Sequence, residues 1–88
     1  MIQQVISHPT LSAMHKQIID HISWRLNVSP SSIHPYTHLE DDLHLDAIDI
    51  LLLIAELESR FNVYLSTEEA NSIETIHDAS IFLQKRAA

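Results

Sequence analysis

The chain of 88 residues contains no glycine, and this absence limits the turns that it can form. Glycine adopts positive φ angles more readily than any other residue, and the tight turns of β-hairpins require such angles. Without glycine, these turns must use asparagine or aspartate, or be avoided. Helices joined by extended connections that contain proline fit this composition better than β-hairpins do. We therefore expect an all-α fold.

Apolar residues recur at helical spacing near the start of the chain. They are spaced three or four residues apart, which places them on one face of a helix. This helix is expected to begin between Ser7 and Leu11 and to end near Leu26. Trp24 and Ile19 are expected to pack at the edge of its apolar face. The face itself consists of Leu11, Met14, Ile18, Ile22 and Leu26.

A second helix is predicted to begin after Asp46, whose side chain can cap it. Asp49 lies in its first turn, where the positive end of the helix dipole favours a carboxylate. Leu51 and Leu52 make this helix apolar on more than one side, so we expect it to be central and covered on several faces. Its main apolar stripe consists of Ile50, Leu53, Ile54, Leu57 and Phe61.

Two further helices follow from their capping signals. Ser66 and Glu69 form a capping box that starts a short helix ending near Asn71. Thr75 caps the last helix, with Asp78 three residues later. The apolar face of this last helix consists of Ile76, Ala79, Phe82 and Leu83.

The connection over residues 27–45 lacks a helical period and contains Pro30 and Pro35. A structureless connection of this length is uncommon in a compact domain, so we expect an ordered loop held by apolar anchors. The expected anchors are Val28, Ile33, Leu39, Leu43 and Leu45. A strand is conceivable at residues 62–65, but it has no partner strand. The predicted architecture is a single domain over residues 1–88, a four-helix bundle with a long first loop and a short third helix.

The charge of the chain restricts its partners. Twelve acidic and five basic residues give a formal net charge of −7, which argues against nucleic acid or an anionic membrane and favours partners with basic patches. The longest apolar run, Ile50–Ala55, is far too short to span a membrane. Residues 1–6 contain no basic residue, so they do not form a secretory signal. We expect a cytoplasmic protein without membrane insertion.

Metal binding and catalysis have little support. Histidine and aspartate residues gather in the long connection, and both side chains bind zinc. They are His34, His38, Asp41, Asp42 and His44. The spacing of His34 and His38 would bring them together only on a helix, which Pro35 disfavours. Cysteine is absent, and no serine lies in a nucleophile motif. We expect no metal site and no enzymatic activity.

Residues 39–49 read LEDDLHLDAID. This stretch resembles the signature of the acyl carrier proteins, in which an acidic E-D-L turn leads to D-S-L-D at the start of the second helix. The resemblance extends over about residues 14–84 and implies the fold of that family, a four-helix bundle. The later matching segments are Glu56-Leu57-Glu58, Phe61, Glu68-Glu69-Ala70, Ile73 and Thr75-Ile76-His77-Asp78-Ala79.

The resemblance implies a cofactor, 4′-phosphopantetheine, which the family's serine carries and whose thiol holds an acyl group. Ala47 occupies the position of that serine, between Asp46 and Ile48. The implied function is to tether acyl intermediates for fatty-acid, polyketide-like or specialised lipid biosynthesis, in a form that cannot be modified at residue 47. Either a deliberate Ser-to-Ala change or a natural loss explains this alanine. The alternative function is a non-acylated, carrier-like protein-interaction module.

The resemblance also implies partners: a phosphopantetheinyl transferase and acyl-processing enzymes with basic docking patches. By analogy, the acids that face these partners are Asp42, Asp46, Asp49 and Glu56. Helix capping or a solvated face explains the same residues more simply. Leu52 and Arg60 stand where strongly acidic members carry glutamate, and His44 and Leu45 replace small residues. These departures indicate a dedicated carrier with its own partners, and a monomer is expected.

Overall fold

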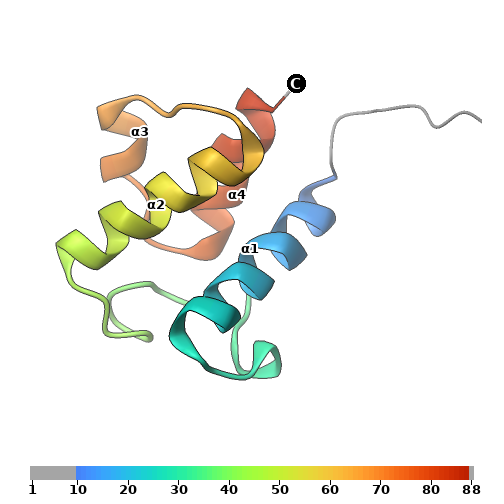
Figure 1. Cartoon of the computed structure of the whole chain (residues 1–88), viewed down its shortest axis with the longest axis vertical. Coiled ribbons are helices and arrows are strands. Elements are labelled where there is room, and N and C mark those ends of the chain that lie inside the picture. Colours follow the sequence, from blue (N-terminus) through green and yellow to red (C-terminus); the bar gives the residue numbers. More distant parts are fainter. Residues whose placement is uncertain (1–9, 88) are drawn as a thin grey trace, which may run out of the picture.

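The computed structural model describes residues 10–87, which form four α-helices and one short 3₁₀ helix (Figure 1). The elements are α1 (Leu11–Leu26), η1 (Pro30–Ser32), α2 (Ala47–Phe61), α3 (Thr67–Asn71) and α4 (Ile76–Arg86). Within these residues there is no strand, and an isolated bridge joins His38 to Thr75. The predicted all-α bundle with a long first connection and a short third helix is confirmed.

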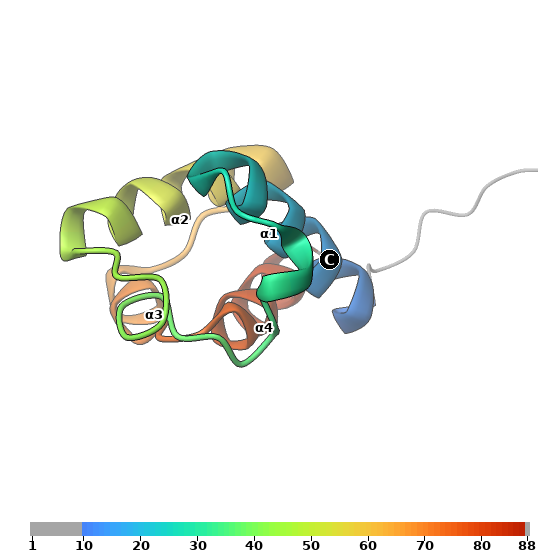
Figure 2. The ribbon, with the colours of Figure 1, turned by 90° about the horizontal axis from the view of Figure 1, so that it is seen from below.

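The helices enclose one apolar core. α1 and α2 run in roughly opposite directions, and α4 lies across the bundle from α2, where it packs extensively against α1 (Figures 1 and 2). All four α-helices and the long connection contribute to the core or pack against it. The buried apolar side chains are Met14, Ile18, Ile22, Ile33, Leu39, Leu45, Leu53, Ile54, Leu57, Val63, Ile73, Ile76, Ala79 and Leu83.

The helices begin where their capping residues place them. The Thr10 hydroxyl accepts a hydrogen bond from the N–H of Ala13 at 3.0 Å, so α1 begins at Leu11. The predicted earlier limit, Ser7, lies outside the described residues. The other predicted caps are confirmed, including both reciprocal capping boxes. They are Asp46 for α2, Ser66 with Glu69 for α3, and Thr75 with Asp78 for α4.

The long connection is ordered by three of its predicted anchors. Ile33, Leu39 and Leu45 are buried, and Leu43 packs against the core. Val28 was wrongly predicted as an anchor, because it follows the left-handed end of α1 and is exposed.

Two predictions about helix faces are also wrong. Trp24 is 76% exposed, because it lies outside the buried stripe of α1 that Met14, Ile18 and Ile22 form. α2 is not covered on several faces, since Leu51 and Leu52 are about half exposed. The core contacts only one side of α2, and its outer side remains apolar and open to solvent.

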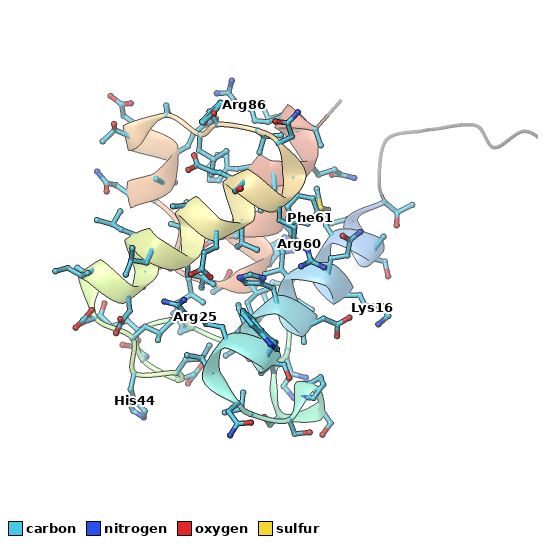
Figure 3. The ribbon with its side chains drawn as sticks, in the orientation of Figure 1. Lys16, Arg25, His44, Arg60, Phe61 and Arg86 are labelled. Carbon is cyan, nitrogen blue, oxygen red and sulfur yellow. The ribbon has the colours of Figure 1, made fainter. Side chains whose placement is uncertain are left out.

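Three residues adopt the left-handed conformation that glycine would otherwise supply. Asn27 and Asn62 have φ angles of 57° and 56° and end α1 and α2. His44 has a φ of 58° and points away from the bundle (Figure 3). Asparagine was expected in this role because its short side chain tolerates the conformation, whereas histidine was not expected.

Replacing the strained residue with glycine tests this account. We expect His44→Gly to stabilise the fold by about 1 kcal/mol and to raise Tm by roughly 4–8 °C, because glycine has no Cβ to clash in this conformation. Thermal unfolding followed by circular dichroism measures the change. The matched control is Asn62→Gly, for which a smaller gain is expected. An unchanged or lower Tm for His44→Gly would contradict the assigned strain.

A cluster of three aromatic rings joins α1, the long connection and α4. The Nε2 atom of His15 lies 3.1 Å from the Nδ1 atom of His77, and the ring of Tyr36 lies 4.9 Å from that of His77. Burial lowers the pKa of His15, and the nearby His77 lowers it further. The pair therefore holds a hydrogen bond only while at least one imidazole is neutral.

This cluster makes the stability of the fold depend on pH. A histidine whose pKa is lowered by folding binds its proton more readily when unfolded. Above the ordinary histidine pKa of about 6.5, the lowered pKa therefore does not reduce the free energy of unfolding. The free energy of unfolding falls as pH drops below that value. The urea midpoint of the unchanged chain is expected to fall between about pH 7.5 and about pH 5.5, and we expect His15→Gln to make this fall smaller. His34→Gln, a change at an exposed position, is the control and should leave the size of the fall unchanged. Equal losses in all three proteins would exclude His15 as the cause.

Candidate functional site

The first turn of α2 and its N-cap bring four of the predicted site residues together at or near the surface. Asp46 accepts a hydrogen bond from the N–H of Asp49 at 2.9 Å, which fixes where the helix begins. Ala47 is the first helical residue and is exposed, and the next side chain, Ile48, is 69% exposed. Backbone N–H groups without helical partners and the positive end of the dipole favour an anion at such a turn.

The chain reaches this turn through a compact loop. The N–H of Leu39 donates to the carbonyl of Glu74 at 2.9 Å, and that of Leu45 to the carbonyl of Leu39 at 3.1 Å. The carboxylate of Asp42 accepts a hydrogen bond from the N–H of His38 at 2.8 Å. Asp42 therefore holds the loop together while remaining exposed. These bonds fasten the segment before Ala47 to the segment before α4.

A groove of about 320 Å³ lies beside Ala47, between α2 and α3. It is lined by Glu40, Ala47, Ile50, Leu51, Ala70, Asn71, Ile73 and Glu74. Its mixed lining suits a ligand with both apolar and polar parts. Most of these residues were not predicted as site residues, because helical spacing within α2 and α3 does not reveal that residues of both helices line one groove.

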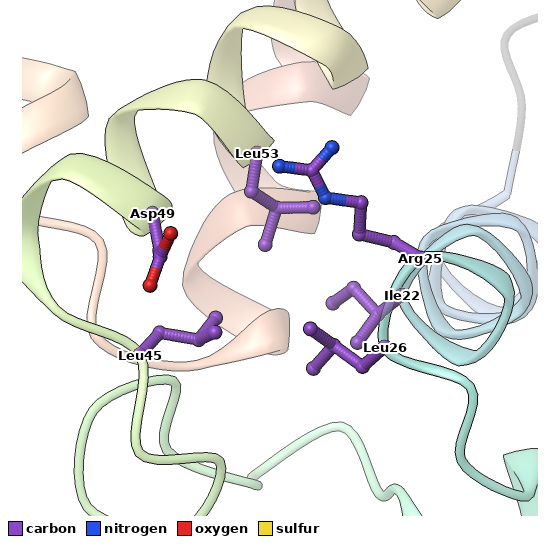
Figure 4. Close-up of a pocket in the computed structure, with 6 residues that line it drawn as sticks. All are labelled: Ile22, Arg25, Leu26, Leu45, Asp49 and Leu53. Atoms are coloured by element: carbon purple, nitrogen blue, oxygen red, sulfur yellow. The ribbon is translucent and has the colours of Figure 1, made fainter.

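A second, smaller hollow lies on the other side of α2, toward α1 (Figure 4). Its volume is about 100 Å³, and its lining is mostly apolar. Arg25 from α1 and Asp49 from α2 contribute the charged groups, and Leu53 projects toward the space between them (Figure 4). The N-terminal half of α2 is thus bordered by a hollow on each side.

Glu56, predicted to face partners, is turned toward α1. Its carboxylate binds the Nε2 atom of His21 at 2.8 Å and the guanidinium of Arg25. The side chains of Arg25 and Glu56 are about one-third exposed, at 34% and 31%. This network joins α1 to α2, and the i, i+4 spacing of His21 and Arg25 is the sequence signal that could have revealed it. The remaining predicted acids, Asp42, Asp46 and Asp49, lie in or near the first turn of α2.

Other candidate sites find no support in the part of the chain that the structure describes. Residues 10–87 contain no group of three or more His, Cys, Asp or Glu side chains that could hold a metal ion. None of the described helices has the length and hydropathy that crossing a membrane requires.

Comparison with known protein families identifies the chain. Residues 16–83 match the family described as the phosphopantetheine attachment site, and this match covers most of the chain. The chain is a member of the acyl carrier protein family. Its α2 begins within the matched region, at Ala47.

Relatives of the chain are named acyl carrier proteins. It is 36% identical to the acyl carrier protein of Syntrophobacter fumaroxidans over 78 residues, which cover 89% of this chain and 96% of the relative. It is 30% identical to the acyl carrier protein of Bdellovibrio bacteriovorus, over 84% of this chain and 95% of the relative. The solved structure of the acyl carrier protein from Enterococcus faecalis is similar to this chain, with a TM-score of 0.72 and 25% sequence identity. The match covers 88% of this chain and 98% of that chain.

Membership defines the general role of the chain. Acyl carrier proteins are carriers without catalytic activity of their own, and they interact with acyl-processing enzymes. Their prosthetic group is 4′-phosphopantetheine, and the protein's part is to bind and present it.

Removing the carboxylate of Glu56 tests its structural role. We expect Glu56→Ala to destabilise the fold by about 1 kcal/mol, because His21 and Arg25 lose their shared partner while solvent screens much of the effect. Urea unfolding measures the loss. The exposed loop residue Asp41 supplies the control, since Asp41→Ala is expected to change stability by less than about 0.5 kcal/mol. If Glu56→Ala lowers the free energy of unfolding no more than Asp41→Ala does, Glu56 has no structural role and its carboxylate is available to bind a partner.

Proposed function

We propose that residue 47 is the attachment position of this carrier and that, with alanine there, the chain carries no 4′-phosphopantetheine. The observation that carries the proposal is the position of Ala47, exposed at the first residue of α2 and lining the groove. Asp46 and Ile48 flank it as in the family pattern. The surroundings fit a phosphate group and a pendant arm, but the methyl side chain has no oxygen with which to form a phosphodiester.

With serine at position 47, we propose that the domain would tether acyl intermediates as thioesters for fatty-acid, polyketide-like or specialised lipid biosynthesis. The alanine has two possible origins, a deliberate change that yields a uniform unmodified protein and a natural loss. The codon at this position in the parent gene distinguishes them. A serine codon identifies an altered carrier, and an alanine codon identifies natural loss.

The proposed partners are a phosphopantetheinyl transferase and acyl-processing enzymes. Asp42, Asp46 and Asp49 are exposed or half-buried around the first turn of α2, where a basic group of a partner can approach them. Glu56 can join this set only by sharing its carboxylate with Arg25 and His21. We propose that the chain forms a single domain over residues 1–88, acts as a monomer, and works in the cytoplasm.

A second candidate function is a protein-interaction module without lipid chemistry. Ala47 itself favours this function, and so does the apolar outer side of α2, which does not depend on a prosthetic group. The two functions differ in whether restoring serine at position 47 restores modification.

Intact-mass measurement distinguishes them. The chain and Ala47→Ser are each incubated with coenzyme A and a broad-specificity phosphopantetheinyl transferase. We expect only Ala47→Ser to gain the mass of the prosthetic group, because it alone offers a hydroxyl at the first turn of α2. Ala55→Ser, an exposed position on the same helix, is the control and should remain unmodified. If Ala47→Ser also stays unmodified, the attachment assignment fails and the interaction module becomes the better description.

A further inference from the structure

We propose that the middle of α2 binds the partner enzymes through an apolar surface rather than through carboxylates. This surface, the outer face of α2, consists of Ile48, Leu51, Leu52 and Ala55. The partner that fits it is an enzyme with an apolar docking cleft and a basic group only at the edge nearest Ala47. The inference deepens the proposed function, since it takes the enzymes of the carrier system as partners.

The outer face is continuous because of its spacing. Its residues lie three, four and seven positions apart, which places them on one side of the helix. Ile48, Leu51 and Leu52 are 69%, 54% and 49% exposed, and Ala55 is exposed too. Large apolar side chains that cluster on a surface in this way commonly mark an interaction site.

The carboxylates of this half of the helix are occupied within the chain. Glu56 binds His21 and Arg25 on α1. Glu58 accepts a hydrogen bond from the N–H of Leu65 at 2.7 Å and thereby turns toward the connection to α3. Between Asp49 and Arg60 the sequence has no other charged residue. A basic patch on a partner would therefore find little to pair with along the outer face.

Charge remains at the N-terminal end of α2. Asp46 is exposed and Asp49 is half-buried, next to the side chain of Ile48. A partner that matches this distribution presents a cation at that end and apolar side chains along the rest. The groove that Leu51 lines and the hollow that Leu53 lines border the helix on its two sides and give such side chains room to enter.

The size of the outer face favours an enzyme over a second copy of the chain. Residues 48 to 55 span about 10 Å along a helix axis. Stable complexes bury roughly 1,200–2,000 Å² in total, which a face of this length does not supply by itself. A small apolar contact suits transient binding, which a carrier requires because each enzyme must release it.

Titration calorimetry tests the proposal on the unchanged chain, against the phosphopantetheinyl transferase of the same organism. We expect Kd to change less than about 3-fold between about 50 and about 500 mM NaCl, because salt screens charge pairs but not apolar contacts. We expect Leu52→Glu to weaken binding about 10-fold or more and Leu52→Met to change it less than about 3-fold. Ile81→Glu on α4 makes the same kind of change at another partly exposed aliphatic residue and should leave Kd unchanged. Circular dichroism verifies that each variant is folded.

Three results would overturn the proposal. They are a Kd that rises steeply with salt, a Leu52→Glu variant that binds as tightly as the unchanged chain, and no measurable binding. Analytical sedimentation of the chain alone tests whether a second copy of the chain occupies the outer face. A dimer that Leu52→Glu dissociates would assign the outer face to that second copy. The titration requires no modification of residue 47. Its failure is therefore distinct from failure of the attachment assignment, which the mass measurement decides.

Discussion

The position of the site depends on how the long connection is fastened to the start of α4. Leu39 donates its N–H to the carbonyl of Glu74, and the N–H of His77 donates to the carbonyl of Pro35 at 2.7 Å. The buried side chains of Leu39 and Leu45 hold the same segment against the core. These contacts join parts of the chain that are far apart in sequence, so the first turn of α2 is held in place from both sides. The exposed Ala47 at the start of α2 contributes little to packing itself, so its position depends on this support.

Most of the fold could be predicted from the sequence because its signals are local. Capping residues such as Asp46, Ser66 and Thr75 act on backbone groups within the next turn, so their effect does not depend on distant contacts. The lack of glycine indicated that asparagine or aspartate would take up positive φ angles, and Asn27 and Asn62 do so at the ends of α1 and α2. It did not indicate His44, because a left-handed histidine has no recognisable sequence signal and is tolerated only when the surrounding loop imposes it.

Features that depend on distant contacts were harder to predict. The apolar residues of α2 looked like the sign of a central helix, whereas Leu51 and Leu52 are open to solvent. Hydropathy cannot distinguish a side chain that packs within its own domain from one that remains available to another protein. In the same way, Glu56 looks like a surface acid in the sequence, and only the arrangement of α1 beside α2 brings it to His21 and Arg25.

The exposed position of Trp24 gives the molecule a built-in optical reporter. It is the single tryptophan of the chain, and its ring lies 5.9 Å from that of His21. His21 is bound to Glu56 on α2, so the indole lies next to the contact that joins the first two helices. The indole therefore lies where a change at the contact between His21 and Glu56 alters its immediate surroundings, and no attached dye is needed to observe it.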